Sequence, residues 1–394
     1  MNNMHSSLSL KGKVFVLILF VFTCLDVHAQ DSLFARKIVD TLTSEYFWGR
    51  GYTKNGMQKA SDFLKQEFQS FGLKPLDGKD YLQPFTYPVN TFPGKMEVSI
   101  NNTLLEAGKD YIISEDSRGV KMEGALLQQD SAHFVNPDKR VVVILQDKLT
   151  WSVAGKAEDY TAILLDKKRF ASIPASIKVN IENKVINAFN TANVCGIVKG
   201  TSKPDSIIFI TAHYDHLGGM GASTYFPGAN DNASGTSLLL TLAKYFGEHP
   251  QKYSVAFICF AGEEAGLLGS KYFTEHPLVN LANIRFLINL DLSGTGDEGI
   301  TIVNATEFPK EFAALQNINK EQHLLAAVNS RGKAANSDHY WFTEKGVPAF
   351  FWYTLGGIKA YHDVFDKSAT LPLNEINDLS TLIKSFVGYL ENEK

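Results

Sequence analysis

The chain has 394 residues, of which 44% are hydrophobic and 20% are charged, and this composition is ordinary for a globular protein. Its length suits roughly two to three domains with well-buried cores. The 38 Lys and Arg residues nearly balance the 42 Asp and Glu residues, so the net charge is −4, and no Lys/Arg-rich block stands out. Composition therefore excludes a disordered, collagen-like or coiled-coil chain, and we expect no nucleic-acid partner.

The first 29 residues have the pattern of a secretory signal peptide. Lys11 and Lys13 precede a short apolar run over 14–24, and the aliphatic Val27 and the small Ala29 indicate cleavage after Ala29. The apolar run is short for a transmembrane anchor, so we expect no stable membrane anchor. The mature protein is then expected to be exported to the periplasm or the extracellular space.

Hydrophobic periodicity predicts an α/β protein. Apolar residues at helical spacing predict helices over 33–42 and 57–71, within an N-terminal helical part that spans 30–90. Short apolar runs separated by turn residues predict a small β-rich insertion over 91–190. From 191 to 394 strands and helices alternate, with strands expected at 193–198, 207–211, 255–260, 286–290 and 349–353 and helices at 234–246, 265–273 and 376–390. This alternation predicts a three-layer αβα domain with a mixed, mostly parallel central sheet.

Two cysteines remain after cleavage of the signal peptide. Cys195 and Cys259 both lie inside apolar strands, where a free thiol behaves as a small hydrophobic side chain. We expect two buried thiols, although a disulfide between neighbouring strands is open to an exported protein.

Polar motifs follow or lie near the ends of the predicted strands, where open α/β sheets bind ligands. Each motif alone has an ordinary explanation, such as a helix cap, a turn, compensation of a helix dipole or a surface histidine. Together they supply the nitrogen and oxygen ligands expected for a pair of divalent ions roughly 3.5–4 Å apart. The candidate ligands are His213, Asp231, Glu264, Asp291 and His362.

Glu263 precedes the candidate ligand Glu264. We expect this pair to open the helix over 265–273, so that the two side chains diverge and Glu263 remains free as a general base. A thiolate site is not indicated, because both cysteines lie inside strands, and a serine nucleophile lacks its Gly-x-Ser-x-Gly turn.

In these motifs and in their order, the last half of the chain resembles the co-catalytic zinc aminopeptidase family. That family includes bacterial leucyl aminopeptidases, aminopeptidase Y and glutamate carboxypeptidase. The motifs are His213-Tyr214-Asp215, Gly228-Ala229-Asn230-Asp231-Asn232-Ala233-Ser234-Gly235, Gly262-Glu263-Glu264, Asn289-Leu290-Asp291 and Tyr361-His362. The FWGRG segment at 47–51 and the helix over 57–71 are also similar to the family's N-terminal segment, and the insertion is similar to a reduced protease-associated domain.

The resemblance implies two zinc ions, and the ligand set would also accept cobalt or manganese. Asp231 would bridge both ions. His213 and Asp291 would complete one site, while Glu264 and His362 would complete the other. The family often has a cis peptide bond after the bridging aspartate, so the bond between Asp231 and Asn232 is expected to be cis.

Further roles follow from the same resemblance. Asp215 would orient His213, and Glu263 would deprotonate the attacking water and later protonate the leaving amine. Tyr361 would donate a hydrogen bond to the tetrahedral oxyanion. Ser337-Asp338-His339 resembles the family's Ser-Asp-His motif, so the segment 336–341 is expected to border the substrate pocket, with Asp338 and His339 orienting loops.

The expected function is that of an exported exopeptidase that removes N-terminal residues from peptides. Aromatic residues at 341 and 350–353 favour an apolar N-terminal side chain. One alternative is a glutaminyl cyclase, which shares the fold but uses one zinc ion. Another is a carboxypeptidase acting on acidic dipeptides, which needs a cationic group that the sequence does not place. A catalytically inactive binding protein would have lost ligands that this chain retains. The sequence predicts no oligomeric state.

Overall fold

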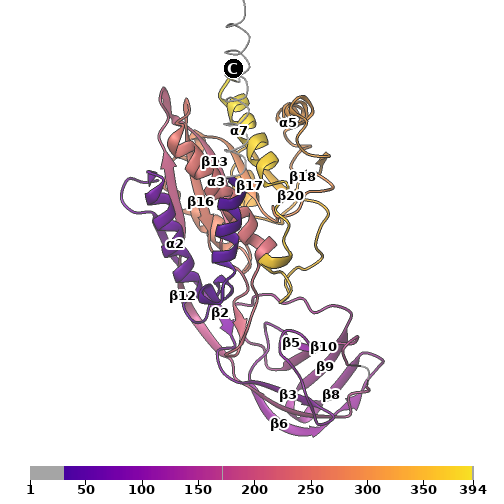
Figure 1. Ribbon diagram of the computed structural model, residues 1–394. Helices are drawn as coiled ribbons and strands as arrows, with labels where there is room; N and C mark the ends of the chain where they lie inside the picture. Colours follow the sequence, from indigo (N-terminus) through magenta and orange to yellow (C-terminus); the bar gives the residue numbers. More distant parts are fainter. Residues whose placement is uncertain (1–30, 171, 393–394) are drawn as a thin grey trace, which may run out of the picture.

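A computed structural model describes residues 31–170 and 172–392 (Figure 1). The predicted signal peptide lies outside these residues. Helices cover residues 31–42 and α2 (Gly56–Ser70), as the apolar spacing predicts. Within the described ranges, no helix is both long and apolar enough to cross a membrane.

A nine-stranded sheet forms the centre of the larger part of the molecule. Its strands follow the order β1-β12-β16-β13-β17-β20-β18-β19, with β2 also paired to β12. The four middle strands run parallel, and antiparallel pairs flank them on both sides. These middle strands are β16 (Tyr253–Phe260), β13 (Lys203–His213), β17 (Ile284–Leu290) and β20 (Ala349–Thr354). The predicted mixed sheet with a parallel centre is therefore confirmed.

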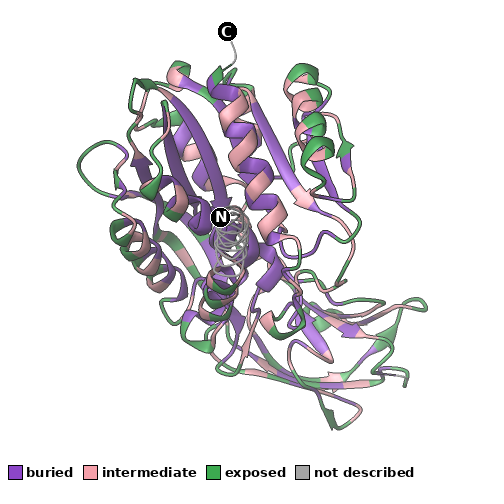
Figure 2. Cartoon of the chain, turned by 45° about the horizontal axis from the view of Figure 1, so that its top comes forward, coloured by how far each residue is buried: buried purple, intermediate pink, exposed green. Residues whose placement is uncertain are grey.

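The outer strands of this sheet are shorter or lead out of it. On one side lie β1 (Lys74–Pro75), β2 (Leu82–Thr91) and β12 (Lys184–Val198), and on the other β18 (Ile300–Val303) and β19 (Val328–Ser330). All eight residues of β16 are buried (Figure 2). Burial on both faces is what a parallel strand covered by two helical layers requires.

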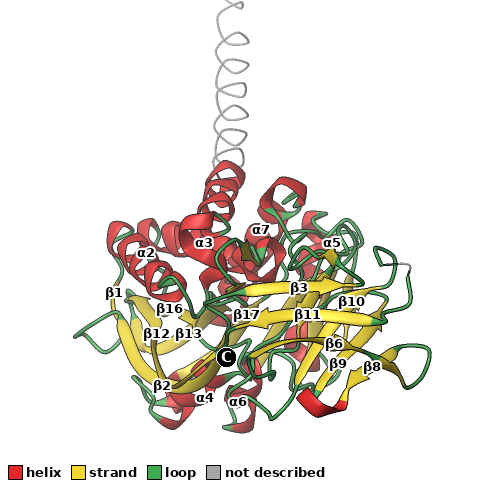
Figure 3. Ribbon diagram, turned by 90° about the horizontal axis from the view of Figure 1, so that it is seen from below, coloured by secondary structure: helices red, strands yellow, loops and turns green. Residues whose placement is uncertain are grey.

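Helices cover both faces of the sheet, which confirms the three-layer αβα arrangement (Figure 3). One layer holds α2, α3 (Gly235–Glu248) and α7 (Ile376–Asn392), with α5 (Pro309–Gln322) packed beside α7. The other layer holds α4 (Leu268–Glu275) and α6 (His339–Glu344). Two separate apolar clusters fill the two interfaces between helices and sheet.

Helix α4 begins three residues later than the sequence predicts. Glu263 and Glu264 lie in the turn before it, so the prediction that they open the helix is wrong. The backbone has positive φ at Gly262, Gly266 and Leu267, and such residues cannot continue a right-handed helix. The two glutamates therefore sit on a loop whose shape is set by the residues around them.

The segment between β2 and β12 forms two small sheets at one end of the molecule (Figure 1). One has the order β5-β10-β9-β8-β7 and the other β4-β3-β11-β6. Their strands are β3 (Met96–Ile100), β4 (Thr103–Leu104), β5 (Tyr111–Ile113), β6 (Val120–Ala125), β7 (Leu127–Gln128), β8 (His133–Asn136), β9 (Val141–Gln146), β10 (Thr161–Asp166) and β11 (Ser176–Ile181). These sheets share an apolar core that also includes Phe226 and Val364 from the larger part.

The two cysteines are free and buried, as expected. They lie on neighbouring strands, and Cys195 pairs with Ile258, one residue before Cys259. Adjacent residues of a strand point to opposite faces, and the two thiols accordingly belong to the apolar clusters on opposite sides of the sheet. A disulfide between them is therefore excluded.

Candidate metal centre

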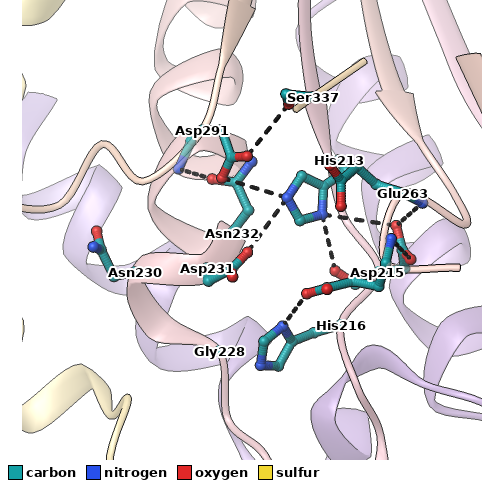
Figure 4. Close-up of polar contacts among 12 residues, drawn as sticks. His213, Asp215, His216, Gly228, Asn230, Asp231, Asn232, Glu263, Asp291 and Ser337 are labelled. Atoms are coloured by element: carbon teal, nitrogen blue, oxygen red, sulfur yellow. Dashed lines mark hydrogen bonds and ion pairs between the residues drawn. The ribbon is translucent and has the colours of Figure 1, made fainter. Parts of the chain in front are cut away.

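All five candidate ligands come from chain segments that follow the parallel strands. His213 ends β13, Asp291 directly follows β17, and Glu264 lies in the turn after β16. Asp231 lies just before α3, in the segment that follows β13, and His362 lies in the loop after β20. The carboxyl ends of parallel strands meet at one edge of a sheet, so these side chains converge. Figure 4 shows His213, Asp231 and Asp291 among them.

Asp231 lies between two histidines. Its Oδ1 is 3.4 Å from Nε2 of His213, and its Oδ2 is 3.1 Å from Nε2 of His362. Nε2 of His213 is also 3.4 Å from Oδ1 of Asp291, while Nε2 of His362 is 3.1 Å from Oε2 of Glu264. The structure thus brings the predicted ligands together as two overlapping sets that share Asp231.

The donor set fits divalent cations. Nε2 of His213 and Oδ1 of Asp291 are buried without a hydrogen-bond partner, and buried polar atoms are rarely left so. His213, Asp231 and Glu264 each offer an atom within 4.8 Å of the others, and so do His213, Glu263 and Asp291. Imidazole nitrogens and carboxylate oxygens at such spacing are the ligands that zinc takes. The second group contains Glu263, which the sequence analysis assigns as a base rather than a ligand.

The pKa values of the two histidines are decided by the carboxylates around them. Burial disfavours the imidazolium, but Asp291 and other acids raise the pKa of His213 well above its usual range. Burial also opposes the charge on His362, yet Glu264 and Asp231 raise its pKa to about 11. Both rings hold protons that a cation would displace.

The two adjacent glutamates differ in their pKa. Burial raises the pKa of Glu263 well above its usual range, and the nearby carboxylates of Asp338 and Glu264 add to the effect. Burial and Asp231 also favour the proton on Glu264, but His362 and His216 outweigh them and hold its pKa at about 2. A carboxyl group that gains a proton readily suits a general base, and one that stays ionised suits a ligand.

Asp215 holds several parts of the site at once. Its carboxylate accepts hydrogen bonds from the backbone N–H groups of Glu263 at 3.2 Å and of Glu264 at 3.3 Å. Nδ1 of His213 lies 3.8 Å from Oδ1 of Asp215 but only 3.2 Å from its backbone carbonyl oxygen. The backbone of Asp215 therefore orients the histidine, while its side chain fixes the turn that carries the glutamates.

Arg50 and Asp366 hold the loop that carries Asp231, and the sequence predicts a role for neither. The guanidinium of Arg50 is fully buried and donates five hydrogen bonds to backbone carbonyls, including those of Gly228 at 2.8 Å and Asp231 at 3.3 Å. Asp366 accepts from the backbone N–H groups of Asn230 and Asp231 at 2.9–3.1 Å. The bond between Asp231 and Asn232 is cis, as the resemblance implies.

His216 is another residue without a predicted role. Its ring is buried, and its Nδ1 lies 2.7 Å from Oε1 of Glu264. Gly228 packs against this ring, and a Cβ atom there would lie 2.4 Å from Cδ2 of His216. Glu264 is thus held by His216 through one oxygen while its other oxygen faces His362.

The insertion reaches into the site through Trp151. The backbone N–H of Trp151 donates to the carbonyl oxygen of His362 at 2.9 Å, and Nδ1 of His362 lies 2.9 Å from the carbonyl oxygen of Trp151. A ring N–H donated at Nδ1 leaves Nε2 free to bind a cation. The indole ring of Trp151 stacks on Phe226 and donates from Nε1 to Ile113 at 2.8 Å. We call these two contacts, one between backbone groups and one from the ring of His362 to the backbone of Trp151, the Trp151–His362 clasp.

The predicted motif at Ser337-Asp338-His339 borders the same centre. Oγ of Ser337 donates to Oδ2 of Asp291 at 3.3 Å and accepts from Asn289 at 2.8 Å. Asp338 is buried and accepts from Ser270 at 2.5 Å. Ser337 therefore contacts a candidate ligand and Asp338 contacts helix α4, while the role of Asp338 and His339 in orienting loops stays a prediction.

A cavity of about 300 Å³ opens beside the candidate ligands. It is lined by Asp231, Glu263, Asp291 and His362 together with Leu292, Arg331, Asn336, Phe351, Tyr353 and Tyr361. Tyr361 is 44% exposed, and its ring stacks on His362 with centroids 4.0 Å apart. The predicted base and the predicted oxyanion donor thus line the same open cavity.

Comparisons with known proteins agree with this geometry. Residues 193–387 match the family model described as peptidase family M28. The chain is 27% identical over 224 residues to aminopeptidase YwaD of Bacillus subtilis (strain 168), covering 54% of this chain and 48% of that protein. It is 34% identical over 141 residues to a probable zinc metalloprotease of Pyrenophora teres f. teres (strain 0-1), covering 34% of this chain and 29% of that protein. The chain spans about half the length, or less, of these curated relatives.

Solved structures show the same fold. A peptidase M28 precursor from Shewanella amazonensis SB2B has a TM-score of 0.71 at 16% identity, over 94% of this chain and 97% of that one. A zinc aminopeptidase from Bacillus subtilis, BSAP, has a TM-score of 0.67 at 17% identity, over 92% and 96%. Both similarities extend through the N-terminal helices and the insertion.

Proposed function

Because residues 193–387 belong to peptidase family M28, we propose that this chain is a metal-dependent aminopeptidase that removes N-terminal residues from peptides. The observation that carries the proposal is the position of Asp231, whose two carboxylate oxygens face His213 at 3.4 Å and His362 at 3.1 Å. A carboxylate placed between two histidines can offer one oxygen to each of two divalent ions.

The proposed cofactor is two zinc ions. His213 and Asp291 would hold one ion and Glu264 and His362 the other, with Asp231 shared. Metal analysis of the purified protein tests this number directly. A stoichiometry of two, reduced to one by His362→Ala, would support the assignment, and a stoichiometry of one in the unaltered protein would contradict it.

The proposed mechanism assigns a step to each remaining polar group of the site. Bound divalent ions lower the pKa of water to about 7 and polarise a carbonyl group. Glu263, whose pKa is raised by burial, accepts the proton of the attacking water and delivers it to the leaving amine. Tyr361 donates a hydrogen bond to the oxyanion that forms on the scissile carbonyl. Asp215 keeps the glutamate turn and His213 in position.

The deciding experiment compares Leu-p-nitroanilide with its N-acetylated form in the presence of zinc. An aminopeptidase cleaves only the substrate with a free amine. Glu263→Gln should lower kcat by about 100-fold or more, since it removes the general base, while the zinc content stays at two. Loss of zinc from this variant would instead make Glu263 a ligand, as its place in the second donor group allows.

If neither substrate is cleaved, the result would favour the two alternatives, a carboxypeptidase and a glutaminyl cyclase. A peptide with a C-terminal Glu tests the carboxypeptidase, and a peptide with an N-terminal Gln tests the cyclase. The carboxypeptidase requires a substrate with a carboxylate. One observation favours such a substrate, because Arg331 lines the cavity beside the candidate ligands.

Export remains part of the proposal and rests on the basic and apolar pattern of residues 11–29. N-terminal sequencing of the protein recovered outside the cytoplasm should begin at Gln30. Recovery of an intact N-terminus from the cytoplasm would contradict it.

A further inference from the structure

Arg331 is a cation in the cavity beside the candidate metal centre, and the proposed mechanism does not use it. The cavity lining includes the carboxylates of Asp231, Glu263 and Asp291. Apart from His362, Arg331 is the one basic side chain among the described residues that line it. A cation at this position can act on the substrate, since it shares the space into which a substrate must enter.

The backbone of Arg331 is fixed to the main sheet. Its N–H donates to the carbonyl oxygen of Ile302 at 2.9 Å, and its own carbonyl oxygen accepts from Ala305 at 3.1 Å. Its side chain donates from Nη1 to the hydroxyl oxygen of Tyr353 at 3.3 Å, and Tyr353 also lines the cavity. The side chain of Arg331 is exposed, and this one hydrogen bond directs its guanidinium along the cavity wall.

The charge of Arg331 is not compensated within the described part of the chain. Its guanidinium forms no salt bridge there, whereas Lys333, two residues further on, pairs with Glu344. Arginine presents a planar fork of donors that matches the two oxygens of a carboxylate. Glu263 is the one acidic residue of the lining that is not assigned to an ion, and the guanidinium of Arg331 offers a substrate carboxylate a partner of opposite charge in the same cavity.

We propose that Arg331, supported by Tyr353, forms a subsite that recognises a carboxylate of the peptide substrate. The inference rests on the proposed function and narrows its substrate class to peptides with a carboxylate near the scissile bond. That carboxylate is either the side chain of an acidic N-terminal residue or the free C-terminus of a dipeptide. This differs from the apolar preference that the aromatic residues around 350–353 suggest in the sequence.

Two matched substrate pairs test the subsite and separate the two sources. Glu-p-nitroanilide and Gln-p-nitroanilide differ in the charge of the N-terminal side chain. The dipeptide Leu-Gly and its C-terminal amide differ in the charge of the C-terminus. We expect the unaltered enzyme to favour the carboxylate member of one pair by about 10- to 100-fold in kcat/KM, the range of a hydrogen bond between charged groups.

Arg331→Gln should abolish that preference, mainly through a higher KM for the charged substrate. Arg331→Lys retains the charge without the fork and should restore part of the preference. Lys333→Gln is the matched control. It removes the same charge at a position two residues from Arg331, and the side chain of Lys333 does not line the cavity. The control should leave the preference unchanged.

Equal kcat/KM values within both pairs would overturn the inference, as would a preference that survives Arg331→Gln. If the enzyme cleaves none of the four substrates, the proposed function fails. Recognition is then measured by calorimetric titration of Leu-Gly and its amide into the zinc-loaded Glu263→Gln protein. If Leu-Gly binds more tightly than its amide and this difference disappears when Arg331→Gln is added, the subsite is supported. Equal affinities for Leu-Gly and its amide would contradict it.

Discussion

At the scale of single residues, His216 shows how a side chain next to the ligands decides their geometry. It occupies one oxygen of Glu264 at 2.7 Å, so that only the other oxygen faces His362. Partners of this kind keep a ligand in one orientation and raise the affinity for the metal. His216 therefore contributes to ion binding without being a ligand itself.

We predict that His216→Ala lowers zinc affinity by about 10- to 100-fold, the usual effect of losing such a partner. Calorimetric titration of the metal-free protein with zinc measures the change. His323→Ala, which alters an exposed histidine, is the control. Unchanged affinity in His216→Ala would show that Glu264 needs no support from this ring.

The pKa values of the candidate ligands predict how zinc binding depends on pH. The acidic residues that surround His213 and His362 raise both pKa values above the usual range, so both rings carry protons near pH 7. Zinc must displace these protons, and its affinity should therefore rise with pH from neutral pH up to the pKa of about 11 at His362. Titrations in buffers of different ionisation enthalpy count the protons released. We expect more than one per protein at pH 7, and a value near zero would contradict these pKa shifts.

The predictable part of the site consists of residues in compact motifs. His213, Asp231, Glu264, Asp291 and His362 each sit in a short polar stretch after a strand, and the structure brings them together. Arg50 lies in the FWGRG segment that resembles the family, but its bonds reach residues as far as 181 positions away, and Arg331 lies in no motif, so no local pattern reveals the role of either. His216 lies inside a motif, but its role depends on Glu264, 48 residues away.

At the scale of elements, the loop before α3 depends on contacts from two other parts of the chain. Arg50 fills its backbone acceptors from one side, and Asp366 accepts from its N–H groups on the other. The irregular backbone of this loop cannot satisfy its own polar groups, and unpaired buried groups are costly. These two residues therefore set the position of Asp231.

We predict that Arg50→Ala lowers the free energy of unfolding by at least about 3 kcal/mol, since it leaves several buried carbonyl groups without donors. Arg50→Lys should not restore stability, because an ammonium group offers fewer donors than the five in use. Thermal unfolding followed by circular dichroism in the presence of a chelator measures the effect without zinc. Arg285→Ala, on an exposed side chain of β17, should leave the melting temperature unchanged.

Elements with a strong apolar period were predictable, and those without one were not. Helices α2 and α7 bury a continuous apolar stripe, and both begin within a residue of the predicted start. Helix α5 was missed because it buries a single residue, Leu315, and so has little apolar period. Helix α4 begins late because of backbone conformations at Gly266 and Leu267 that no apolar pattern encodes.

At the scale of the whole molecule, the insertion and the metal centre are joined by the Trp151–His362 clasp. The clasp depends on the indole ring of Trp151, which stacks on Phe226 and anchors its segment to Ile113. Lys148 adds a hydrogen bond to the carbonyl oxygen of Lys359 at 3.0 Å, in the loop that leads to His362. The loop of a candidate ligand is thus shaped by the smaller part of the molecule.

We predict that Trp151→Ala weakens binding of one of the two proposed zinc ions by about 10-fold or more, since the backbone carbonyl that accepts from His362 loses the indole ring that anchors it. Removing a buried tryptophan also costs about 3–5 kcal/mol of packing. Zinc titration resolves the two binding steps, and Leu127→Ala on an exposed residue of the insertion is the control. Equal loss of both steps would point to general unfolding rather than to the clasp.

The clasp also makes ion binding and docking of the insertion two linked equilibria. A cation that binds better when His362 is held by Trp151 stabilises the contact between the insertion and this loop. By reciprocity, that contact raises the affinity for the cation by the same factor. Any ligand that pulled the insertion away would then release an ion without touching the site. Conversely, removal of the cation would weaken the hold of Trp151 on the loop of His362, and the insertion would then be held mainly by the apolar core that it shares with Phe226 and Val364.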